Sequence, residues 1–290
     1  MTEKKLILGT VQFGIPYGVN NLVGQPSKQE IFTILKKAYE HGIRTLDTAA
    51  AYGNSEKLIG DFLQSNPEMG FKIITKIKTD DSVDFEKSLT ASLTNLKIDS
   101  VNTILFHSFT DFKKNINKHR NSINKHKGNL FEKIGVSIYD NNEIIELLDN
   151  DLIDVIQAPF NLLDNKTQRG HLFKELQSKG KIVHTRSSFL QGLFFMNKEV
   201  IPKGLSPLIP FLDEIKKLCN QYDISVQELS LNYVLNKKYI DGVLFGVDNV
   251  SQLNQNMANI NPQLPEDLIN AIDEINVIDN FLLNPSKWKI

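Results

Sequence analysis

Residues 41–56 read HGIRTLDTAAAYGNSE, and within them the short run IRTLD (43–47) ends on a carboxylate. Seven comparable runs occur along the chain, and their centres are mostly apolar on consecutive residues rather than on alternate ones. This pattern is typical of parallel strands that are buried on both faces. The strand candidates are residues 6–10, 43–47, 71–76, 102–107, 132–137, 154–158, 181–187 and 242–246.

Amphipathic helical patterns lie between these runs. The clearest begins at Ser27, where Ser27 and Glu30 form a capping-box pattern, and Gly42 is placed to end it. Strands that are each followed by a helix predict an α/β fold, a (β/α)8 TIM barrel that spans residues 1–290 as a single domain. The runner-up is an open doubly wound sheet, but the first turn, GTVQFGIPYG (9–18), lacks its usual G-x-G-x-x-G spacing. The other predicted helices are 54–65, 83–97, 113–127, 141–149, 166–179, 207–222, 225–237, 249–258 and 265–276.

Composition narrows the class of protein. The chain has 290 residues, 41% of them hydrophobic, and a formal net charge of −1, which gives no general attraction to nucleic acid or membranes. The single cysteine, Cys219, fits a reducing compartment, and its place on an apolar helix face predicts a buried structural thiol. We find no apolar run typical of a signal peptide or membrane span, so we expect a cytoplasmic protein. The basic segment 113–127 is interpreted as the solvent face of an outer helix rather than a nucleic-acid or phosphate surface.

Polar residues that suit proton transfer lie at strand ends or just after one. They are Asp47, Tyr52, Lys76 and His107. A parallel barrel gathers the carboxyl ends of its strands at one face, so we expect these side chains to meet. A tyrosine hydroxyl has an ordinary pKa near 10; a neighbouring lysine favours the phenolate, and a carboxylate keeps that lysine charged.

The order of action follows from this chemistry. Asp47 supports Lys76, and Lys76 tunes Tyr52, which exchanges a proton with a substrate oxygen. His107 can donate a hydrogen bond to the same oxygen. Each residue alone has an ordinary structural explanation, and only their joint occurrence favours catalysis. We predict no metal site, because the histidines show no metal-ligand spacing, and no serine hydrolase, because a G-x-S-x-G elbow is missing.

With these residues identified, the sequence resembles the aldo-keto reductase superfamily over about residues 6–260. The most specific segment is HGIRTLDTAAAYGNSEKLIG (41–60), which contains the strong signature D-T-A-x-x-Y-G-x-S-E. The resemblance implies that the four residues above form the catalytic tetrad. It also implies a barrel that binds NAD(P)H in an extended form and transfers hydride to a carbonyl carbon, with Tyr52 as the acid, or as the base in the reverse direction.

The resemblance further implies cofactor contacts at the ends of several strands. The helix that follows the last strand is expected to present free N–H groups to a phosphate. The implied contacts are Gly9 and Thr10 under the nicotinamide ribose, Ser137 and Gln157 at the carboxamide, Ser187, Gly192 and Leu193 over the pyrophosphate, and Gly246, Val247, Asp248, Gln252 and Asn256 at the adenosine end.

The sequence departs from the family pattern at three positions. Ile138 replaces an asparagine that often helps to hold the carboxamide. Arg186 replaces the aromatic residue that stacks on the nicotinamide; its planar guanidinium can also stack, and its charge would favour the reduced cofactor. Asp248 argues for NAD(H), whereas the superfamily habit and Lys198 or Lys203 argue for NADP(H). The balance slightly favours NADP(H), with NAD(H) possible.

Three segments resemble a bacterial branch that is associated with sugar and polysaccharide metabolism: GTVQFG, G-Q-P-S and R-S-x-F-L-Q-G-L. The resemblance implies a sugar or sugar-nucleotide carbonyl as the substrate. Loops 13–17, 108–112 and 160–163 are expected to line its pocket, and Trp288 either closes over the pocket or packs on the barrel.

We therefore predict an NAD(P)H-dependent oxidoreductase that reduces an aldehyde or ketone of a sugar or sugar derivative. Two alternatives are a catalytically silent NAD(P)-binding regulatory subunit and an aldose dehydrogenase that works in the oxidation direction. The expected partner is a small carbonyl compound, with neither nucleic acid nor membrane. The sequence leaves the substrate, the direction of reaction and the oligomeric state open.

Overall fold

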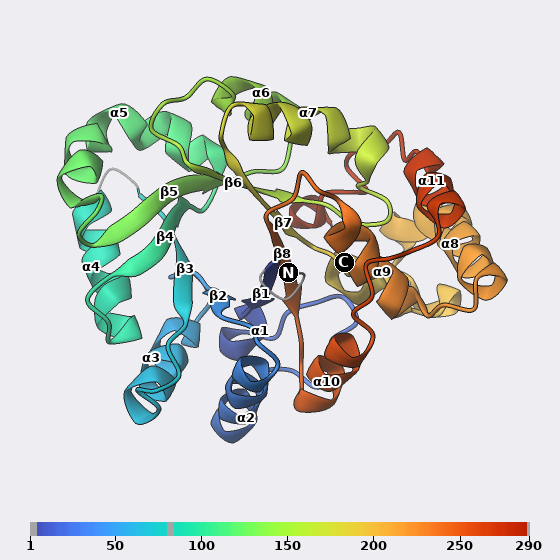
Figure 1. Ribbon diagram of the computed structural model, residues 1–290, viewed down its shortest axis with the longest axis horizontal. Helices are drawn as coiled ribbons and strands as arrows, with labels where there is room; N and C mark the ends of the chain where they lie inside the picture. Colours follow the sequence, from blue (N-terminus) through green and yellow to red (C-terminus); the bar gives the residue numbers. More distant parts are fainter. Residues whose placement is uncertain (1–4, 80–83, 289–290) are drawn as a thin grey trace.

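The computed structural model describes residues 5–79 and 84–288. Within these ranges, eight parallel strands form a closed barrel in sequence order, with β8 paired to β1, and helices encircle it (Figure 1). The predicted (β/α)8 barrel is confirmed. The strands are β1 (Leu6–Gly9), β2 (Thr45–Asp47), β3 (Lys72–Ile77), β4 (Val101–Phe106), β5 (Phe131–Ser137), β6 (Val155–Pro159), β7 (Ile182–Arg186) and β8 (Gly242–Gly246).

The predicted helices are also present, most with ends within about three residues of those expected. Position 83 of the predicted helix 83–97 lies outside the described residues. The sequence did not predict α1 (Val11–Gly14) or the short 3-10 turns. The longer helices are α2 (Lys28–Glu40), α3 (Ser55–Ser65), α4 (Phe85–Leu96), α5 (Phe109–His126), α6 (Asn141–Leu147), α7 (Lys166–Ser178), α8 (Ile209–Gln221), α9 (Val226–Asn236), α10 (Val250–Ala258) and α11 (Glu266–Glu274). The 3-10 turns are η2 (Leu190–Phe195), η3 (Lys198–Val200), η4 (Lys203–Leu208) and η5 (Pro285–Lys287).

The first long helix, α2, forms one of the two hydrogen bonds of its predicted capping box. The Ser27 hydroxyl accepts a hydrogen bond from the Glu30 N–H, and Gly42 follows the helix with a φ of 83°. The Glu30 carboxylate does not turn back to its own helix as a capping box requires. Instead it accepts a hydrogen bond from the Val250 N–H of α10, at 2.8 Å. The prediction was wrong in this half because the neighbouring helix supplies a better-placed donor.

Alternation along the strands decides which side chains reach the barrel interior. A small apolar cluster is formed by Ile7, Ile74, Leu105, Val155 and Leu244, one residue from each of five strands. Side chains two residues further along a strand point to the same face. The residues two positions further along these strands are Gly9, Lys76, His107, Gln157 and Gly246. They therefore lie on the same inner face of the strands as the apolar cluster.

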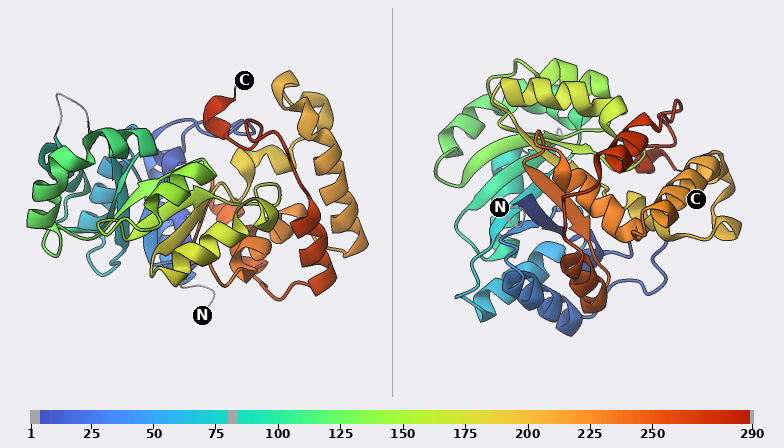
Figure 2. Two further views of the ribbon diagram at one scale, coloured as in Figure 1. Left: turned by 90° about the horizontal axis from the view of Figure 1, so that it is seen from above. Right: turned by 45° about the vertical axis from the view of Figure 1, so that its right-hand side comes forward.

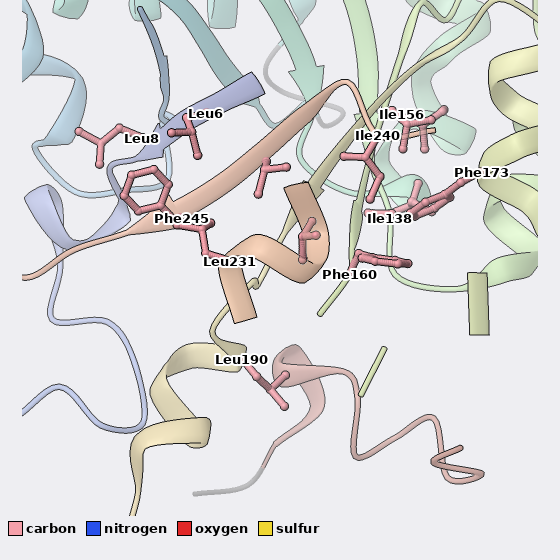
Figure 3. Packing of buried hydrophobic residues seen from close by; sticks show 14 of the residues in the cluster. Leu6, Leu8, Ile138, Ile156, Phe160, Phe173, Leu190, Leu231, Ile240 and Phe245 are labelled. Atoms are coloured by element: carbon pink, nitrogen blue, oxygen red, sulfur yellow. The ribbon is translucent and has the colours of Figure 1, made fainter. Parts of the chain in front are cut away.

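The larger hydrophobic core lies between the strands and the outer helices. Figure 3 shows part of it, where Phe160, at the end of β6, packs against Phe173 of α7 with ring centroids 5.6 Å apart. Cys219 of α8 is buried, as predicted, and burial raises the pKa of its thiol to about 11. Trp288 donates a hydrogen bond to the Leu282 carbonyl and packs against the core, which decides between its two predicted positions.

The basic segment lies on α5, on the outside of the barrel, as predicted. Its exposed cations pair with acidic residues of neighbouring elements, for example Lys113 with Glu146 and Arg120 with Asp151. The left view of Figure 2 shows this green helix at one edge of the molecule. In the part of the chain that the structure describes, no helix is both long enough and apolar enough to cross a membrane.

Candidate active site

A cavity of about 430 Å³ opens at the carboxyl ends of the strands. Its size falls in the range of small-molecule sites, and its place is the usual one for chemistry in a (β/α)8 barrel. All four predicted catalytic residues line it: Asp47, Tyr52, Lys76 and His107. The cavity extends from these residues to Asp248, Gln252 and Asn256 beyond β8.

Lys76 contacts two of the other three predicted catalytic residues. Its ammonium is fully buried and forms an ion pair with Asp47. It also donates to the Thr48 carbonyl at 3.2 Å and to the Tyr52 hydroxyl at 3.4 Å, so all three of its hydrogens have acceptors. Burial acts to lower the pKa of Lys76, but the charges and hydrogen bonds of Asp47 and Tyr52 outweigh it and raise that pKa above its ordinary value. Lys76 therefore stays charged beside Tyr52.

Two glycines fix the loop that carries Tyr52. A β carbon on Gly14 of α1 would lie 1.6 Å from the Tyr52 carbonyl oxygen, so the two backbones touch. Gly53 has a φ of 53°, and a β carbon there would lie 2.3 Å from the Gly14 carbonyl oxygen. Ser55 ties the end of the loop to β1 by donating to the Thr10 carbonyl at 2.9 Å. The glycine and serine of the motif thus hold the tyrosine in place.

His107 faces Tyr52 with its ring edge-on, at a centroid distance of 5.9 Å. Burial, together with the positive charges of Lys76, Lys78 and Arg186, lowers the pKa of His107 to about 3. The imidazole is therefore neutral near pH 7. A neutral ring can donate one hydrogen bond without carrying a charge, which suits a group that orients a carbonyl oxygen.

Gln157, which is predicted to hold the carboxamide, contacts one of the predicted catalytic residues. Its amide nitrogen donates to Asp47 at 2.8 Å, so the Asp47 carboxylate bridges Lys76 and Gln157. Within residues 5–79 and 84–288, the Gln157 amide oxygen is buried and has no hydrogen-bond partner. It is thus an available acceptor for the amide N–H of a carboxamide. Gly9 and Gly246 are paired across β1 and β8 and line the cavity with backbone alone, which leaves room for a flat ring. Gln157 and the two glycines therefore fit a nicotinamide cofactor.

Arg186 ends β7 and lines the same part of the cavity. Its guanidinium lies over the Tyr139 ring, 4.0 Å from the centroid, and donates to the Ile138 carbonyl at 2.7 Å. One face of the guanidinium is therefore covered by a side chain of the protein itself. The predicted stacking of Arg186 on a nicotinamide ring would use its other face.

The far end of the cavity contains amides and one carboxylate. Asp248 receives hydrogen bonds from Asn21 at 3.4 Å and from Gln252 at 3.3 Å, and burial raises its pKa. Lys198 and Lys203, which were expected to supply positive charge here, are exposed and do not line the cavity.

The N-terminus of α10 differs from the expectation that its N–H groups are free for a phosphate. The Val250 N–H donates to Glu30, and the Gln252 N–H donates to Asn249. The N–H of Asp248, just before the helix, donates to the Gln252 side chain. Side chains therefore already occupy these three donors: Glu30 of α2 bonds to one of them, and Asn249 and Gln252 bond to the other two.

Two loops meet over the cavity. The Gln191 amide, on the loop after β7, donates to the Tyr17 hydroxyl, on the loop after β1, at 3.0 Å. A β carbon on Gly192 would lie 2.8 Å from the Asn20 side chain. The loop after β7 is strained, since Ser187, Leu190 and Gln191 have φ values of 62°, 46° and 56°. Such strain in residues other than glycine is common where a loop serves a site.

Most of the predicted cofactor residues line the cavity, but two do not. Leu193 and Val247 are buried in the core, which leaves only their backbone for a ligand. The lining residues among those predicted are Gly9, Thr10, Ser137, Gln157, Arg186, Ser187, Gly192, Gly246, Asp248, Gln252 and Asn256.

The predicted pocket loops were largely wrong. Of loop 13–17 only Tyr17 lines the cavity, while Phe13 is in the core. Loops 108–112 and 160–163 do not line it, because their aromatic and aliphatic side chains fill the space between the barrel and its helices. Several other lining residues were not predicted from the sequence. The only local sign of their role is that they lie near a strand end or near another site residue. They are Gln12, Asn20, Asn21, Tyr139, Phe189, Gln191, Phe195, Gln227 and Gln255.

Comparison with known proteins agrees with this geometry. The sequence matches the Aldo/keto reductase family over residues 5–277. It is 24% identical to the NADH-specific methylglyoxal reductase of Escherichia coli (strain K12), over 92% of each chain. It is 26% identical to the L-galactose dehydrogenase of Arabidopsis thaliana, over 87% of this chain and 84% of that protein.

Solved structures show the same fold. An aldo-keto reductase of Bacillus halodurans in its holo form has a TM-score of 0.73 at 20% identity, with 93% of this chain and 91% of that chain covered. The glycerol dehydrogenase of Gluconobacter oxydans has a TM-score of 0.70 at 20% identity, with 93% and 90% covered. The chain belongs to the Aldo/keto reductase family and is therefore an oxidoreductase of the kind that uses a nicotinamide cofactor.

Proposed function

We propose that this chain reduces a small aldehyde or ketone, with Tyr52 as the proton donor. The observation that carries the proposal is the buried Lys76, which donates to Asp47, to the Thr48 carbonyl and to the Tyr52 hydroxyl. A nicotinamide cofactor supplies the hydride to the carbonyl carbon when it is bound. Tyr52 gives its proton to the carbonyl oxygen, and the charge of Lys76 stabilises the phenolate that remains.

The other residues of this end orient the reactants. Neutral His107 donates a hydrogen bond to the carbonyl oxygen and holds it next to Tyr52. Ser137 and Gln157 bind the carboxamide, for which the unpartnered Gln157 oxygen is the acceptor. In the direction of oxidation the same groups act in reverse, with Tyr52 as the base. The polar lining from Gln12, Tyr17 and Tyr139 suits a hydroxylated or dicarbonyl substrate such as a sugar derivative or methylglyoxal, the compound named for the E. coli relative.

The decisive test of the reaction is Tyr52→Phe. We expect this change to lower kcat for methylglyoxal by about 10²–10⁴-fold, since a positioned acid is removed while the ring is kept. The measurement is the loss of NADH absorbance at saturating methylglyoxal. Tyr222→Phe, outside the cavity at the end of α8, is the matched control and should keep full activity. Equal kcat values for Tyr52→Phe and the wild type would remove Tyr52 from the mechanism.

We also propose that the cofactor is NADH rather than NADPH, which reverses the slight preference expected from the sequence. The support is the chemistry of the adenosine end: Asp248 lines it, Glu30 caps the helix beside it, and both expected lysines are exposed away from the cavity. A carboxylate repels the 2′-phosphate of NADPH and can accept a hydrogen bond from a ribose hydroxyl.

Titration of the purified protein with each cofactor tests this choice. Quenching of protein fluorescence gives the two Kd values, and we expect NADH to bind about tenfold or more tightly than NADPH. Tighter binding of NADPH would refute the choice of cofactor but not the reaction. Binding of neither would count against the function as a whole.

A further inference from the structure

We propose that the carbonyl substrate carries an anionic group, a carboxylate or a phosphate, and that Arg186 binds it. This inference rests on the proposed function and names the substrate class of the same site. Arg186 lies at the reaction end of the cavity, where it interacts electrostatically with both His107 and Tyr17. It would hold the anion while the carbonyl reaches Tyr52.

The guanidinium has hydrogen-bond donors to spare. It carries five N–H groups in a planar fork that matches carboxylate and phosphate oxygens. In the described residues, one of its nitrogens donates to the Ile138 carbonyl, and no carboxylate forms an ion pair with Arg186. Tyr139 covers one flat face of the guanidinium, whereas the N–H groups point outward from its edge. The N–H groups that do not bond to Ile138 are therefore available for an anion.

The charges around the cavity leave this arginine uncompensated. Among the described lining residues the acidic side chains are Asp47 and Asp248, and the basic ones are Lys76 and Arg186. Asp47 is paired with Lys76, and Asp248 lies at the far end, where it bonds to Asn21 and Gln252. Because His107 is neutral, the reaction end carries one net positive charge, on Arg186.

The position of Arg186 is built into the fold rather than left to a flexible side chain. The aromatic support, Tyr139, is fixed by Arg169, whose guanidinium donates to the Tyr139 carbonyl at 2.6 Å. Arg169 is held in turn by a two-point ion pair with the buried Asp164, at 2.5 and 2.9 Å. Asp164 also interacts with Arg186, but its oxygens are bound to Arg169. This carboxylate is thus already paired with another arginine.

Tyr17 supplies a second donor on the opposite loop. Its hydroxyl accepts a hydrogen bond from Gln191 at 3.0 Å, which leaves its own hydrogen to donate into the cavity. Burial raises the pKa of Tyr17 to about 12, so the hydroxyl keeps this hydrogen near neutral pH. The cation at the end of β7 and the neutral donor on the loop after β1 form a recognition pair for one anionic group.

Matched substrates of equal length give the first test. Values of kcat/KM with NADH are compared for 4-oxobutanoate against butanal, and for glyceraldehyde 3-phosphate against glyceraldehyde. We expect the wild type to prefer at least one anionic member by about tenfold to a hundredfold, the range of a charge-assisted hydrogen bond. The pair that shows the preference identifies a carboxylate or a phosphate. Ratios near one for both pairs would overturn the inference, while turnover of the neutral aldehydes would leave the proposed reaction standing.

The second test removes the charge with Arg186→Gln, which keeps an amide donor for the Ile138 carbonyl. We expect the preference to fall to about one; because Arg186 also lines the end predicted to hold the nicotinamide, the ratio of the two kcat/KM values within each pair is the readout, not either value alone. Lys198→Gln removes an exposed cation on the same loop and should change nothing. If Arg186→Gln weakened NADH binding and left the anion preference intact, Arg186 would serve the cofactor pyrophosphate instead, and the inference would be wrong.

A binding measurement makes the result independent of turnover. Titration calorimetry of 4-oxobutanoate and of glyceraldehyde 3-phosphate is performed without NADH on the wild type and on Arg186→Gln. We expect at least one anion to bind the wild type about tenfold or more tightly than the variant. Equal affinities, or no binding of either anion to the wild type, would refute the role of Arg186 even if the protein were catalytically silent.

Discussion

The two ends of the cavity are built from different kinds of groups. The reaction end contains a buried ion pair between Asp47 and Lys76, a neutral histidine, and an arginine that forms no ion pair with any described residue. The adenosine end contains Asp248 among amide side chains and a helix N-terminus that is already capped. A buried pair of opposite charges dominates the first end, while hydrogen bonds from amide groups to carboxylate and amide oxygens dominate the second.

In the proposed function, this difference assigns catalysis to one end and the choice of cofactor to the other. At the reaction end, removal of a charge leaves another charge buried without a partner, which is costly. At the adenosine end, each hydrogen bond has a small net effect, and selectivity depends on one repelling carboxylate. We therefore expect large effects on stability from changes at the first end and moderate effects on binding from changes at the second.

Asp47→Asn tests the strongest of these contacts. The change leaves the buried Lys76 without its carboxylate, so we expect the free energy of unfolding to fall by about 3–5 kcal/mol. Urea unfolding near neutral pH measures the loss. The double change Asp47→Asn with Lys76→Met should restore most of the stability, because both charges are then gone. Asp149→Asn breaks an exposed pair with Lys179 and should have little effect. If Asp47→Asn alone were as stable as the wild type, the reaction end would not depend on its charge pair, and the comparison of the two ends would be wrong.

The pH dependence of stability tests the neutral His107. The pKa of His107 is about 3 in the folded state, against an ordinary value near 6.5. Between these two pH values, the histidine of the unfolded chain binds a proton that the folded chain does not bind. Its contribution to stability is therefore lost as the pH falls, by about 2 kcal/mol between about pH 7 and about pH 5. In His107→Gln this part of the decrease should disappear.

Urea unfolding at the two pH values measures the effect of His107. The decrease will not vanish altogether in the variant, because burial also lowers the pKa of His184, to about 4. His171→Gln, on the exposed side of α7, should show the same decrease as the wild type. A decrease in His107→Gln as steep as that of the wild type would mean that His107 is charged in the folded protein.

Asp248→Asn tests the far end. The change removes the repelling charge and keeps a side chain of the same size, so we expect the affinity for NADPH to rise about tenfold and that for NADH to change by less than about threefold. Fluorescence titration gives both Kd values. Asp213→Asn, on the exposed side of α8, is the control for a change in net charge. An unchanged ratio of the two affinities would show that Asp248 does not select the cofactor.

The smallest expected effect concerns the contact between the two loops. Gln191→Leu removes the hydrogen bond to Tyr17, whose net value of about 0.5–1.5 kcal/mol corresponds to an increase of about two- to tenfold in the dissociation rate of NADH. Stopped-flow displacement measures this rate. Gln177→Leu breaks a comparable bond to the Lys238 carbonyl on the outside of the barrel and should leave the rate unchanged. A rate for Gln191→Leu equal to that of the wild type would mean that the loops do not retain the cofactor.

Much of the fold could be predicted because the decisive signals are local. Apolar runs and caps report how each segment is buried, and alternation along a strand places Lys76 and His107 on the same side as the interior residues Ile74 and Leu105. The order of the strands then brings their carboxyl ends together. The four predicted catalytic residues, which line one cavity, could be picked out because each of them lies at or just after such an end.

The prediction was less complete where a residue's partner is distant in sequence. Gln157 meets Asp47 across 110 positions, and Glu30 caps a helix 220 positions away, so neither contact has a local pattern. The left-handed backbone at Leu190 and Gln191 also lacks the glycine that would reveal it.

By itself, the sequence determined the eight-stranded barrel, the family signature and the residues able to transfer a proton. Only the tertiary structure decided that Arg186 lies on Tyr139 without an ion pair to any described residue, that the N-terminus of α10 is already capped, and that loops 108–112 and 160–163 fill the core. The physical reason is that burial and alternation are properties of each segment. Charge pairing, in contrast, depends on which segments the closed barrel brings into contact.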